Sequence, residues 1–303
     1  MPELPDVTVY VERLSALTRN ATLLGVRLRS PFLLRSVEPP IATVKDRRVQ
    51  EIRRLGKRIV MGLEGDLFLV LHLMIAGRLH WKELGAPIAA KQNLAAFDFS
   101  CGSLVLTEQS SKRRASLYVV AGAAALAAHD RGGLEPLDCS YAEFKQRLCS
   151  ENRTLKRALT APHLFSGIGN AYSDEILHAA GLSPVTLTSR LSPAEIRKLH
   201  RAMQQTLTRW TDMLRAESAA DFPKKVTAFR PEMAVHGRFR QPCPACTTLV
   251  QRIRYAENEV NYCPRCQTGG KMLADRSLSR LLGDDWPRTV EAWEEEHPKV
   301  SEP

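Results

Sequence analysis

The sequence predicts an α+β protein with an N-terminal β-sandwich flanked by helices, then a helical domain, then a C-terminal ribbon with paired cysteines. Short apolar runs broken by Gly, Asp and Pro fill residues 22–120, a pattern typical of strands and hairpins. Apolar residues return to helical spacing from Ser140 onward. Four of the seven cysteines then fall in two tight pairs between residues 243 and 266. These patterns set the order of the domains.

The composition indicates a polyanionic partner. The chain has 303 residues, 44% of them hydrophobic, which is enough for two domains with their own cores. Its formal charge of +10 favours nucleic acid as the partner. No apolar run approaches the roughly 20 residues that span a bilayer, and no signal peptide precedes the first helical pattern. We therefore expect a monomeric, cytoplasmic, nucleoid-associated protein with no membrane partner.

An amphipathic helix is predicted almost at the N-terminus, over residues 5–18. Its apolar positions at 3-4-3 spacing are Leu4, Val7, Val11 and Leu14. Removal of Met1 would expose the secondary amine of Pro2 at the positive end of this helix, with Glu3 beside it. Such an amine is a potential nucleophile. An isolated Met-Pro-Glu is more often an ordinary N-terminus, so the rest of the chain must decide.

A basic run over residues 45–60 reads KDRRVQEIRRLGKRIV, with seven basic and two acidic side chains. A solvated charged face is the default interpretation of such a run. Lys57, however, lies where the run meets an apolar strand, a reasonable place for a functional lysine.

A helical hairpin is predicted from HLFSGIGNAYSDEILHAAGLSP, in which glycines bracket a turn before a second helix. Asn170 is the predicted N-cap of that helix and Gly181 its C-cap. With NRTLKRAL as the preceding helix, exposed backbone amides and Lys156 could bind a phosphate. An ordinary structural hairpin explains this segment equally well when it is taken alone.

The longest helix is predicted from SPAEIRKLHRAMQQTLTRWTDML. Ser192 is its N-cap, Pro193 its first residue, and Glu195 completes a capping box. The buried stripe is predicted to comprise Ile196, Leu199, Met203, Leu207, Trp210 and Leu214. We expect this helix to be scaffold.

The paired cysteines predict a metal site. Their spacing is C-x2-C-x16-C-x2-C, and the ligands are Cys243, Cys246, Cys263 and Cys266. Four thiolates around one Zn²⁺ leave no open coordination position, so the zinc is expected to be structural. The remaining cysteines, expected to be plain thiols, are Cys101, Cys139 and Cys149.

In this order, these pieces resemble the Fpg/Nei family of DNA glycosylase/AP lyases, over nearly the whole chain to about Gln267. The resemblance is carried by MPELPDV, the segment around Lys57, HLMIAGRL, SGIGNAYSDEIL, VHGR at 235–238, and CPAC with CPRC-Gln. It implies a catalytic β-sandwich domain at 1–127, a linker at 128–138, a helix-two-turn-helix DNA-binding domain at 139–236, a zinc finger at 237–271 and an acidic tail at 272–303. Double-stranded DNA with damaged bases or abasic sites would bind in the cleft between domains.

The resemblance also implies a mechanism. Pro2 would be the nucleophile that attacks C1′ of the damaged nucleotide and forms an iminium ion. Glu3 would be the general acid/base that opens the sugar ring, and Lys57 would assist lesion or phosphate contact and proton transfer. Lys156 and Asn170 match the family's phosphate-binding positions around the flipped nucleotide.

The sequence departs from the family pattern where DNA is contacted. Ile75 stands at the position of a void-filling Met, and Arg113 supplies the void-filling Arg, but Ala115 replaces the expected Phe. Asn258 replaces the finger arginine and can bind phosphate only without charge assistance. Segment 218–234 does not resemble the loop that closes over 8-oxoguanine in some relatives.

The leading hypothesis is therefore a bifunctional DNA-formamidopyrimidine glycosylase-like enzyme and AP lyase for oxidised purines. Within the enzyme class, oxidised pyrimidines, hydantoins or crosslinked bases are alternative substrates. Outside it, a noncatalytic damaged-DNA-binding protein on the same fold is motivated by the missing Phe and finger Arg. An unrelated zinc-ribbon protein that binds nucleic acid is a third class.

Overall fold

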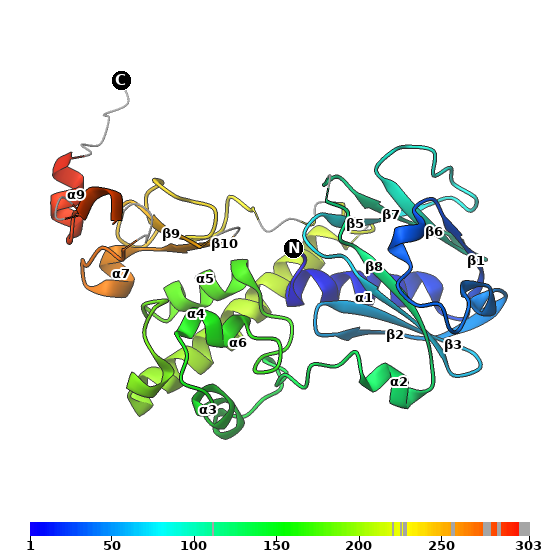
Figure 1. Ribbon diagram of the computed structural model, residues 1–303, viewed down its shortest axis with the longest axis horizontal. Helices are drawn as coiled ribbons and strands as arrows, with labels where there is room; N and C mark the ends of the chain where they lie inside the picture. Colours follow the sequence, from blue (N-terminus) through cyan, green and yellow to red (C-terminus); the bar gives the residue numbers. More distant parts are fainter. Residues whose placement is uncertain are drawn as a thin grey trace. The chain divides into compact units, whose positions relative to one another are not determined.

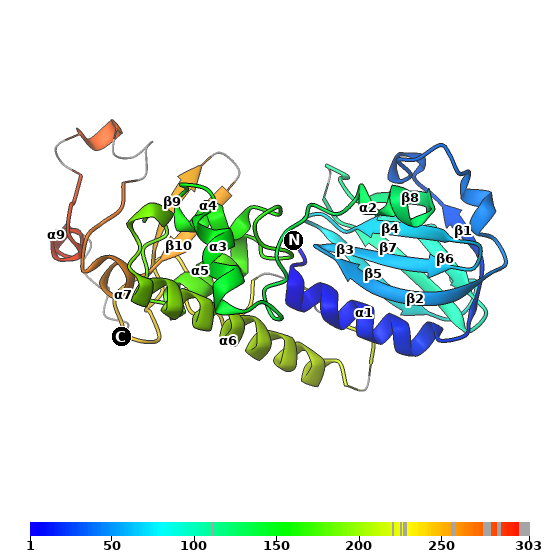
Figure 2. The same ribbon diagram turned by 90° about the horizontal axis from the view of Figure 1, so that it is seen from below.

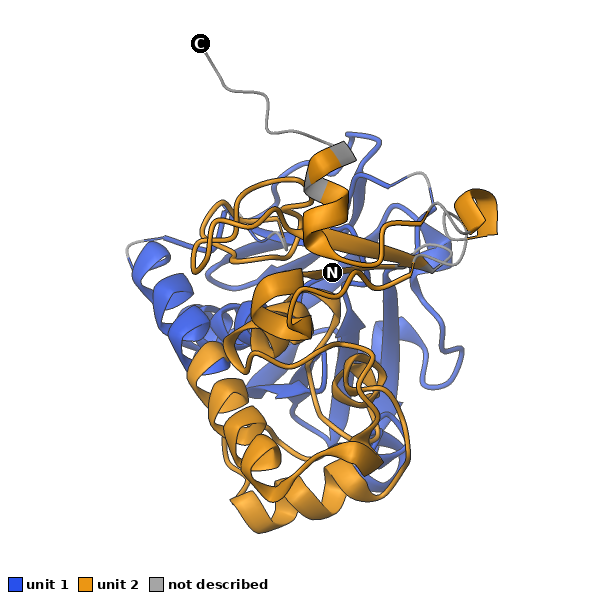
Figure 3. Cartoon of the chain, turned by 90° about the vertical axis from the view of Figure 1, so that its left-hand side faces the viewer, with its two compact units in different colours: residues 1–133, 207–227 blue, residues 134–206, 228–303 orange. Residues whose placement is uncertain are grey.

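The computed structural model contains two compact units (Figure 3). It describes residues 1–110, 112–219, 221–224, 226, 229–255, 258–274, 280–283 and 286–296. The first unit comprises Met1–Gly133 and Leu207–Thr227, and the second comprises Leu134–Thr206 and Ala228–Pro303. Each unit is described by itself below.

Eight antiparallel strands form the sheet of the first unit (Figure 1). They are β1 (Thr22–Leu28), β2 (Arg47–Leu55), β3 (Arg58–Leu63), β4 (Leu67–His72), β5 (Gly77–Lys82), β6 (Asn93–Phe99), β7 (Gly102–Glu108) and β8 (Ser116–Ala121). Their order is β5-β7-β6-β1-β2-β3-β4-β8. Strands β1 and β2 share only two residue pairs, Thr22 with Arg48 and Leu23 with Arg47. The predicted sandwich therefore consists of two four-stranded halves joined at this short seam.

One apolar core fills the first unit. It takes Phe97 and Leu104 from one half of the sheet and Met61 and Leu69 from the other, all fully buried. Helix α1 (Leu4–Thr18) packs against β2, and Figure 2 shows the two elements side by side. The short elements of this unit are η1 (Pro31–Leu33), η2 (Ile41–Val44) and α2 (Ala123–Ala127). The α+β fold class predicted from the sequence is confirmed.

The second unit begins with helices. They are α3 (Tyr141–Cys149), α4 (Leu155–Thr160), α5 (Asn170–Ala179), η3 (Thr188–Arg190) and α6 (Pro193–Glu217), the last of which continues into the first unit. The predicted capping box of α6 is present: Glu195 N donates to Ser192 Oγ at 3.3 Å, and Ser192 N donates to Glu195 Oε2 at 2.8 Å. All six residues of its predicted apolar stripe are buried.

The C-terminal part of the second unit is a hairpin followed by short helices. Strands β9 (Gln251–Tyr255) and β10 (Asn258–Tyr262) pair antiparallel, and α7 (Pro264–Thr268) and α9 (Val290–Glu296) follow. The tail returns to the ribbon: Val290 N donates to Gly270 O at 2.9 Å, and Val290 and Trp293 are buried. Across the described residues, every helix is too short or too polar to cross a membrane.

Candidate functional site

The N-terminus of the first unit carries a buried carboxylate pair. Glu3 occupies the N-cap position of α1 and is 1% exposed, and Pro2 before it is buried. The backbone N of Glu3 donates to Asp6 Oδ2 at 2.9 Å. Carboxylates are stabilised at a helix N-terminus because the unpaired amides and the helix dipole are positive there. The fold therefore holds acidic side chains beside the start of the chain.

Two cations also act on the terminal amine, which belongs to Met1 in the structure. Burial lowers the pKa of this amine below its ordinary value of 8.0, Arg78 and Lys57 lower it further, and Glu3 and Asp6 oppose them. Lys57 lies in the tight turn between β2 and β3, where Gly56 takes a φ of 61°. The structure thus brings Glu3 and Lys57 into electrostatic reach of the N-terminus.

Arg78 is a member of this cluster that sequence reasoning missed. It is the second residue of β5, and its Nη1 donates to the carbonyls of Gly77 at 2.7 Å and Ile75 at 3.3 Å. A Cβ on Gly77 would lie 2.3 Å from Leu73 O, so only glycine fits this turn. The side chain of Ile75 is 53% exposed at the tip of the turn. Arg78 lies in HLMIAGRL, one of the segments that carry the family resemblance, but nothing in the sequence placed it beside the N-terminus.

His72, at the end of β4, also lies in HLMIAGRL, although no role was predicted for it. Burial, with Arg58 and Lys57 nearby, lowers its pKa to about 4, so the ring is neutral at pH 7. Its Nδ1 accepts a hydrogen bond from Met74 N at 3.0 Å, which places the ring proton on Nε2. His72 is also paired with Arg58 across β3 and β4. It shapes the turn that carries Ile75.

Arg113 lies on an exposed loop before β8, and its Nη2 donates to Lys91 O at 2.9 Å. The buried carboxylate of Glu108 organises this loop by accepting from Arg114 N and Ala115 N, each at 3.1 Å. Ala115 is only 2% exposed. The position that carries the expected wedge Phe in the family therefore faces the interior of this protein.

In the second unit, Lys156 is buried and paired. Its Nζ lies 2.6 Å from Asp174 Oδ1 and 2.6 Å from the carbonyl oxygen of Asn170. The other carboxylate oxygen of Asp174 lies 2.8 Å from His236 Nδ1 and accepts from Asn261 N at 3.2 Å. Asp174 thereby connects α4, α5, the segment before the ribbon, and β10.

Asn170 was predicted to be the N-cap of α5, but the helix begins one residue earlier than that prediction requires. Gly169 is the N-cap of α5, with extended backbone, and Asn170 is the first helical residue. Its side-chain Nδ2 donates to Glu259 O in β10 at 2.8 Å instead of capping the helix. Asn258 begins β10, where its backbone pairs with Tyr255, and its side chain lies outside the described part of the structure.

Glu175 is a further residue that the sequence did not identify as functional. Its carboxylate accepts three backbone hydrogen bonds, from Ala234 N at 2.7 Å, Val235 N at 2.9 Å and His236 N at 3.0 Å. Two of these amides, those of Val235 and His236, belong to VHGR at 235–238, and Ala234 directly precedes it. The adjacent acids in SDEIL were the available signal, because acidic residues on a buried helix face need specific partners.

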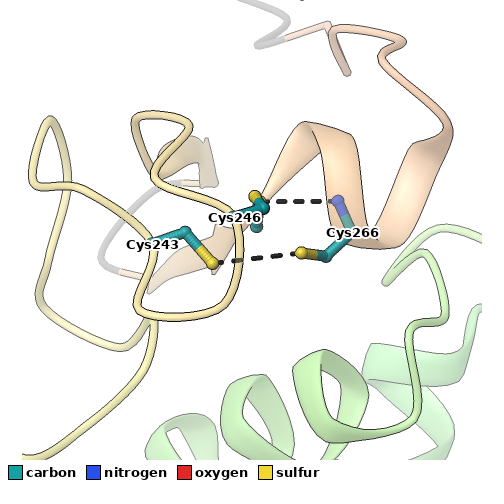
Figure 4. Close-up of side chains that lie close together, drawn as sticks. Cys243, Cys246 and Cys266 are labelled. Carbon is teal, nitrogen blue, oxygen red and sulfur yellow. Dashed lines mark hydrogen bonds between the residues drawn. The ribbon is translucent and has the colours of Figure 1, made fainter.

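The four predicted metal ligands come together. All four sulfurs lie within 4.8 Å of one another. The Cys246–Cys263 sulfurs are 3.4 Å apart, and the Cys243–Cys266 sulfurs, joined by a dashed line in Figure 4, are 4.0 Å apart. A tetrahedral zinc with Zn–S bonds of about 2.3 Å requires sulfurs roughly 3.8 Å apart. The cluster therefore has the donor set and the spacing to hold a metal ion.

Two protein-family models match the chain. The formamidopyrimidine-DNA glycosylase N-terminal domain matches residues 1–115, and the H2TH domain of the same enzyme matches residues 133–218. The formamidopyrimidine-DNA glycosylase of Chloroflexus aurantiacus is 31% identical over 277 residues, which cover 88% of this chain and 98% of that enzyme. That of Heliobacterium modesticaldum is 32% identical, covering 88% and 100%.

A Mycobacterium tuberculosis protein, called an uncharacterized formamidopyrimidine-DNA glycosylase-like protein, is 39% identical over 150 residues, covering 50% of this chain and 93% of that protein. Among solved structures, Lactococcus lactis Fpg bound to abasic-site DNA matches with a TM-score of 0.77 at 23% identity, covering 88% and 99%. MutM bound to DNA containing carbocyclic 8-oxo-G matches with 0.77 at 22%, covering 88% and 100%. At these identities the structural likeness establishes the fold.

Proposed function

Since the chain belongs to the formamidopyrimidine-DNA glycosylase family of DNA-repair enzymes, we propose that it excises damaged bases with Pro2 as nucleophile and then cleaves the strand. The observation that supports the proposal is the setting of the chain start: Pro2 is buried directly before α1, and Glu3 is the N-cap of that helix. Burial, with Arg78 and Lys57, lowers the pKa of the Met1 amine against the opposing effect of Glu3 and Asp6, and we expect the same surroundings to act on the Pro2 amine once Met1 is removed. A lowered pKa leaves a larger fraction of the amine neutral near pH 7, and only the neutral amine is a nucleophile. The proposal requires that Met1 be removed, which frees the Pro2 nitrogen.

The chemistry proceeds in balanced steps. The nitrogen lone pair of Pro2 forms a bond to C1′ as the bond from C1′ to the damaged base breaks and the base leaves with its electron pair. The Pro2 nitrogen carries a proton after the attack and releases it to the departing base. Glu3 then donates a proton to O4′, the nitrogen lone pair forms the C1′=N bond as the C1′–O4′ bond breaks, and an iminium ion results. Loss of a proton from C2′ then expels the 3′ phosphate by β-elimination, and a second elimination can expel the 5′ phosphate. Water hydrolyses the remaining iminium and regenerates the amine.

Phosphate contacts are proposed for the second unit. Two of the three Nζ donors of Lys156 have partners among the described residues, which leaves one for a DNA phosphate. Asn170 and the start of α5 lie beside it and offer further donors. Asn258 is proposed to contact phosphate from the ribbon. The Cys cluster is proposed to hold one structural Zn²⁺ that keeps the β9–β10 hairpin folded.

Ile75 and Arg113 are proposed to occupy the space left by the flipped nucleotide. Both side chains are exposed, on the β4–β5 turn and on the loop before β8. Flipping costs unstacking energy that inserted side chains partly recover. Because the protein lacks a Phe wedge, we expect it to act more easily on base pairs that damage has already weakened. Oxidised purines remain the proposed substrates.

Cleavage of a duplex with one abasic site tests the proposal. We expect the natural protein to nick this strand and Pro2→Gly, which lacks the secondary amine, to lose the activity. Pro5→Ala, at the proline in the first turn of α1, leaves the terminal amine intact and should retain the activity. For base excision, Glu3→Gln should be slower by roughly 10²–10⁴-fold, the usual contribution of a general acid. Tight binding to the abasic site without any cleavage would instead favour the noncatalytic binding protein.

A further inference from the structure

The Cys cluster is touched by one side chain from the helical part of the second unit. Nε2 of His178, the ninth residue of α5, lies 3.2 Å from Cys243 Sγ. The ring is half-buried and Cys243 is 1% exposed. Within the described structure, the other hydrogen bonds of the four sulfurs, such as Cys266 N to Cys263 Sγ at 3.5 Å, come from the ribbon itself.

The direction of this hydrogen bond follows from the metal. A metal-bound cysteine is a thiolate and has no proton to donate, so Nε2 must carry the proton that the two atoms share. Four thiolates together exceed the charge of one Zn²⁺, and hydrogen bonds to their sulfurs relieve the excess negative charge. An N–H donor at Cys243 therefore stabilises the loaded site.

A second contact ties the ribbon to the same end of α5. Gln267 accepts from Cys263 N at 2.8 Å through Oε1 and donates to Leu182 O at 3.0 Å through Nε2. Leu182 follows the C-terminal turn of α5, four residues after His178. Two side chains thus connect the metal ligands to this end of α5: His178 from the helix and Gln267 from the ribbon.

We propose that His178 is a positioning residue of the metal site, which donates its Nε2 proton to the Cys243 thiolate and couples zinc binding to helix α5. The inference rests on the proposed zinc and is independent of the glycosylase chemistry. It has a structural consequence, because α5 also carries Asn170 and Asp174. Loss of zinc should therefore loosen both the ribbon and α5, the helix that supplies the partners of Lys156.

Zinc affinity of the full-length protein, measured by competition with a chromophoric chelator, tests the proposal. Removing an outer hydrogen-bond partner of a metal ligand typically weakens the metal by 10- to 100-fold, so His178→Phe should show a loss of about that size. His178→Gln keeps an amide N–H near the Nε2 position and should recover most of the affinity. His163→Phe, at an exposed histidine paired with Glu151, is the matched control and should bind zinc normally. Equal affinity of His178→Phe and the natural protein would overturn the proposal.

The tautomer of His178 gives a test that needs no variant. Long-range ¹H–¹⁵N correlation of the zinc-loaded natural protein should show a neutral ring with its proton on Nε2. A proton on Nδ1 alone would refute the hydrogen bond even if His178→Phe failed to fold. If the natural protein binds no zinc, the metal site itself is refuted. If it binds zinc and His178→Phe binds zinc with the same affinity, only the role of His178 is refuted.

Discussion

Lys156 and Asp174 form a buried ion pair in the second unit, with Nζ 2.6 Å from Oδ1 and the two residues 8% and 1% exposed. The desolvation of two charges is expensive, and the pair is stable because each group has further partners: Asn170 O for the lysine, and His236 and Asn261 for the carboxylate. The pair holds the proposed phosphate-binding lysine in place before DNA arrives. Preorganisation of this kind lowers the entropic cost of binding.

Asp174→Asn should strongly destabilise the protein, since it leaves the Lys156 charge buried without its counter-ion. Breaking a buried pair typically costs about 3–5 kcal/mol, measurable by urea denaturation. The Asp174→Asn, Lys156→Met double variant should lose less than the sum of the single changes. Asp212→Asn, which removes an exposed partner of Arg215, is the control and should cost no more than about 1 kcal/mol. A single variant as stable as the natural protein would show that the pair has no structural role.

Arg78→Gln should shift the pH dependence of strand cleavage at abasic sites. The positive charge of Arg78 helps to lower the pKa of the terminal amine, so its removal raises that pKa. The neutral amine then appears only at higher pH, and the rising limb of the pH–rate profile moves toward alkaline pH. Lys82→Gln, at the exposed end of β5, should leave the limb in place. If the rising limb of the pH–rate profile of Arg78→Gln is unchanged, a group other than the terminal amine beside Arg78 sets the pH dependence.

The wedge positions should respond in opposite ways to substitution. Ile75→Ala should slow excision of a damaged base while changing stability by no more than about 0.5 kcal/mol, because the side chain is 53% exposed. Ala115→Phe should not restore a wedge but destabilise the protein by about 1–3 kcal/mol, because Ala115 is buried. Thermal unfolding and a single-turnover excision assay separate the two effects. Faster excision by Ala115→Phe at unchanged stability would contradict this account of the loop.

Chelation of the metal should unfold the ribbon. The four cysteines are the only described group of His, Cys, Asp or Glu side chains clustered closely enough to hold a metal ion, so elemental analysis should find one zinc per chain. Its removal should abolish the protection of β9 and β10 against hydrogen exchange, because such sites fold only with metal. Protection in the first unit should persist. Full protection of β9 and β10 in the metal-free protein would contradict a structural zinc.

Features decided by neighbouring residues were predictable from the sequence. The capping box of α6 depends only on Ser192 and Glu195, and the Cys cluster depends on a fixed spacing, so both appeared as predicted. The resemblance to the family added the expected domain bounds and the expected roles of the site residues. Asn170 shows the limit of local reasoning: glycine at 169 served as the N-cap, and the Asn side chain bound β10, which is distant in sequence.

Features decided by tertiary contacts were not predictable. The adjacent acids Asp174 and Glu175 indicated only that specific partners were needed, and those partners, Lys156 and the amides of residues 234–236, are set by the fold. Arg78 acts on the terminal amine only because the fold packs β5 against α1, where Leu79 N donates to Tyr10 Oη at 3.3 Å. His178 is likewise unremarkable in the sequence until the ribbon places Cys243 beside it.

We claim that the Pro2 nitrogen attacks the sugar, and trapping the covalent intermediate tests this step. Incubation of the natural protein with abasic-site DNA and borohydride should reduce the iminium to a stable adduct, which proteolysis and mass spectrometry can locate. We predict a sugar fragment on the N-terminal peptide, attached to Pro2, with Met1 absent. An adduct on Lys57 or another lysine, or DNA bound with no adduct on a chain that retains Met1, would contradict the claim.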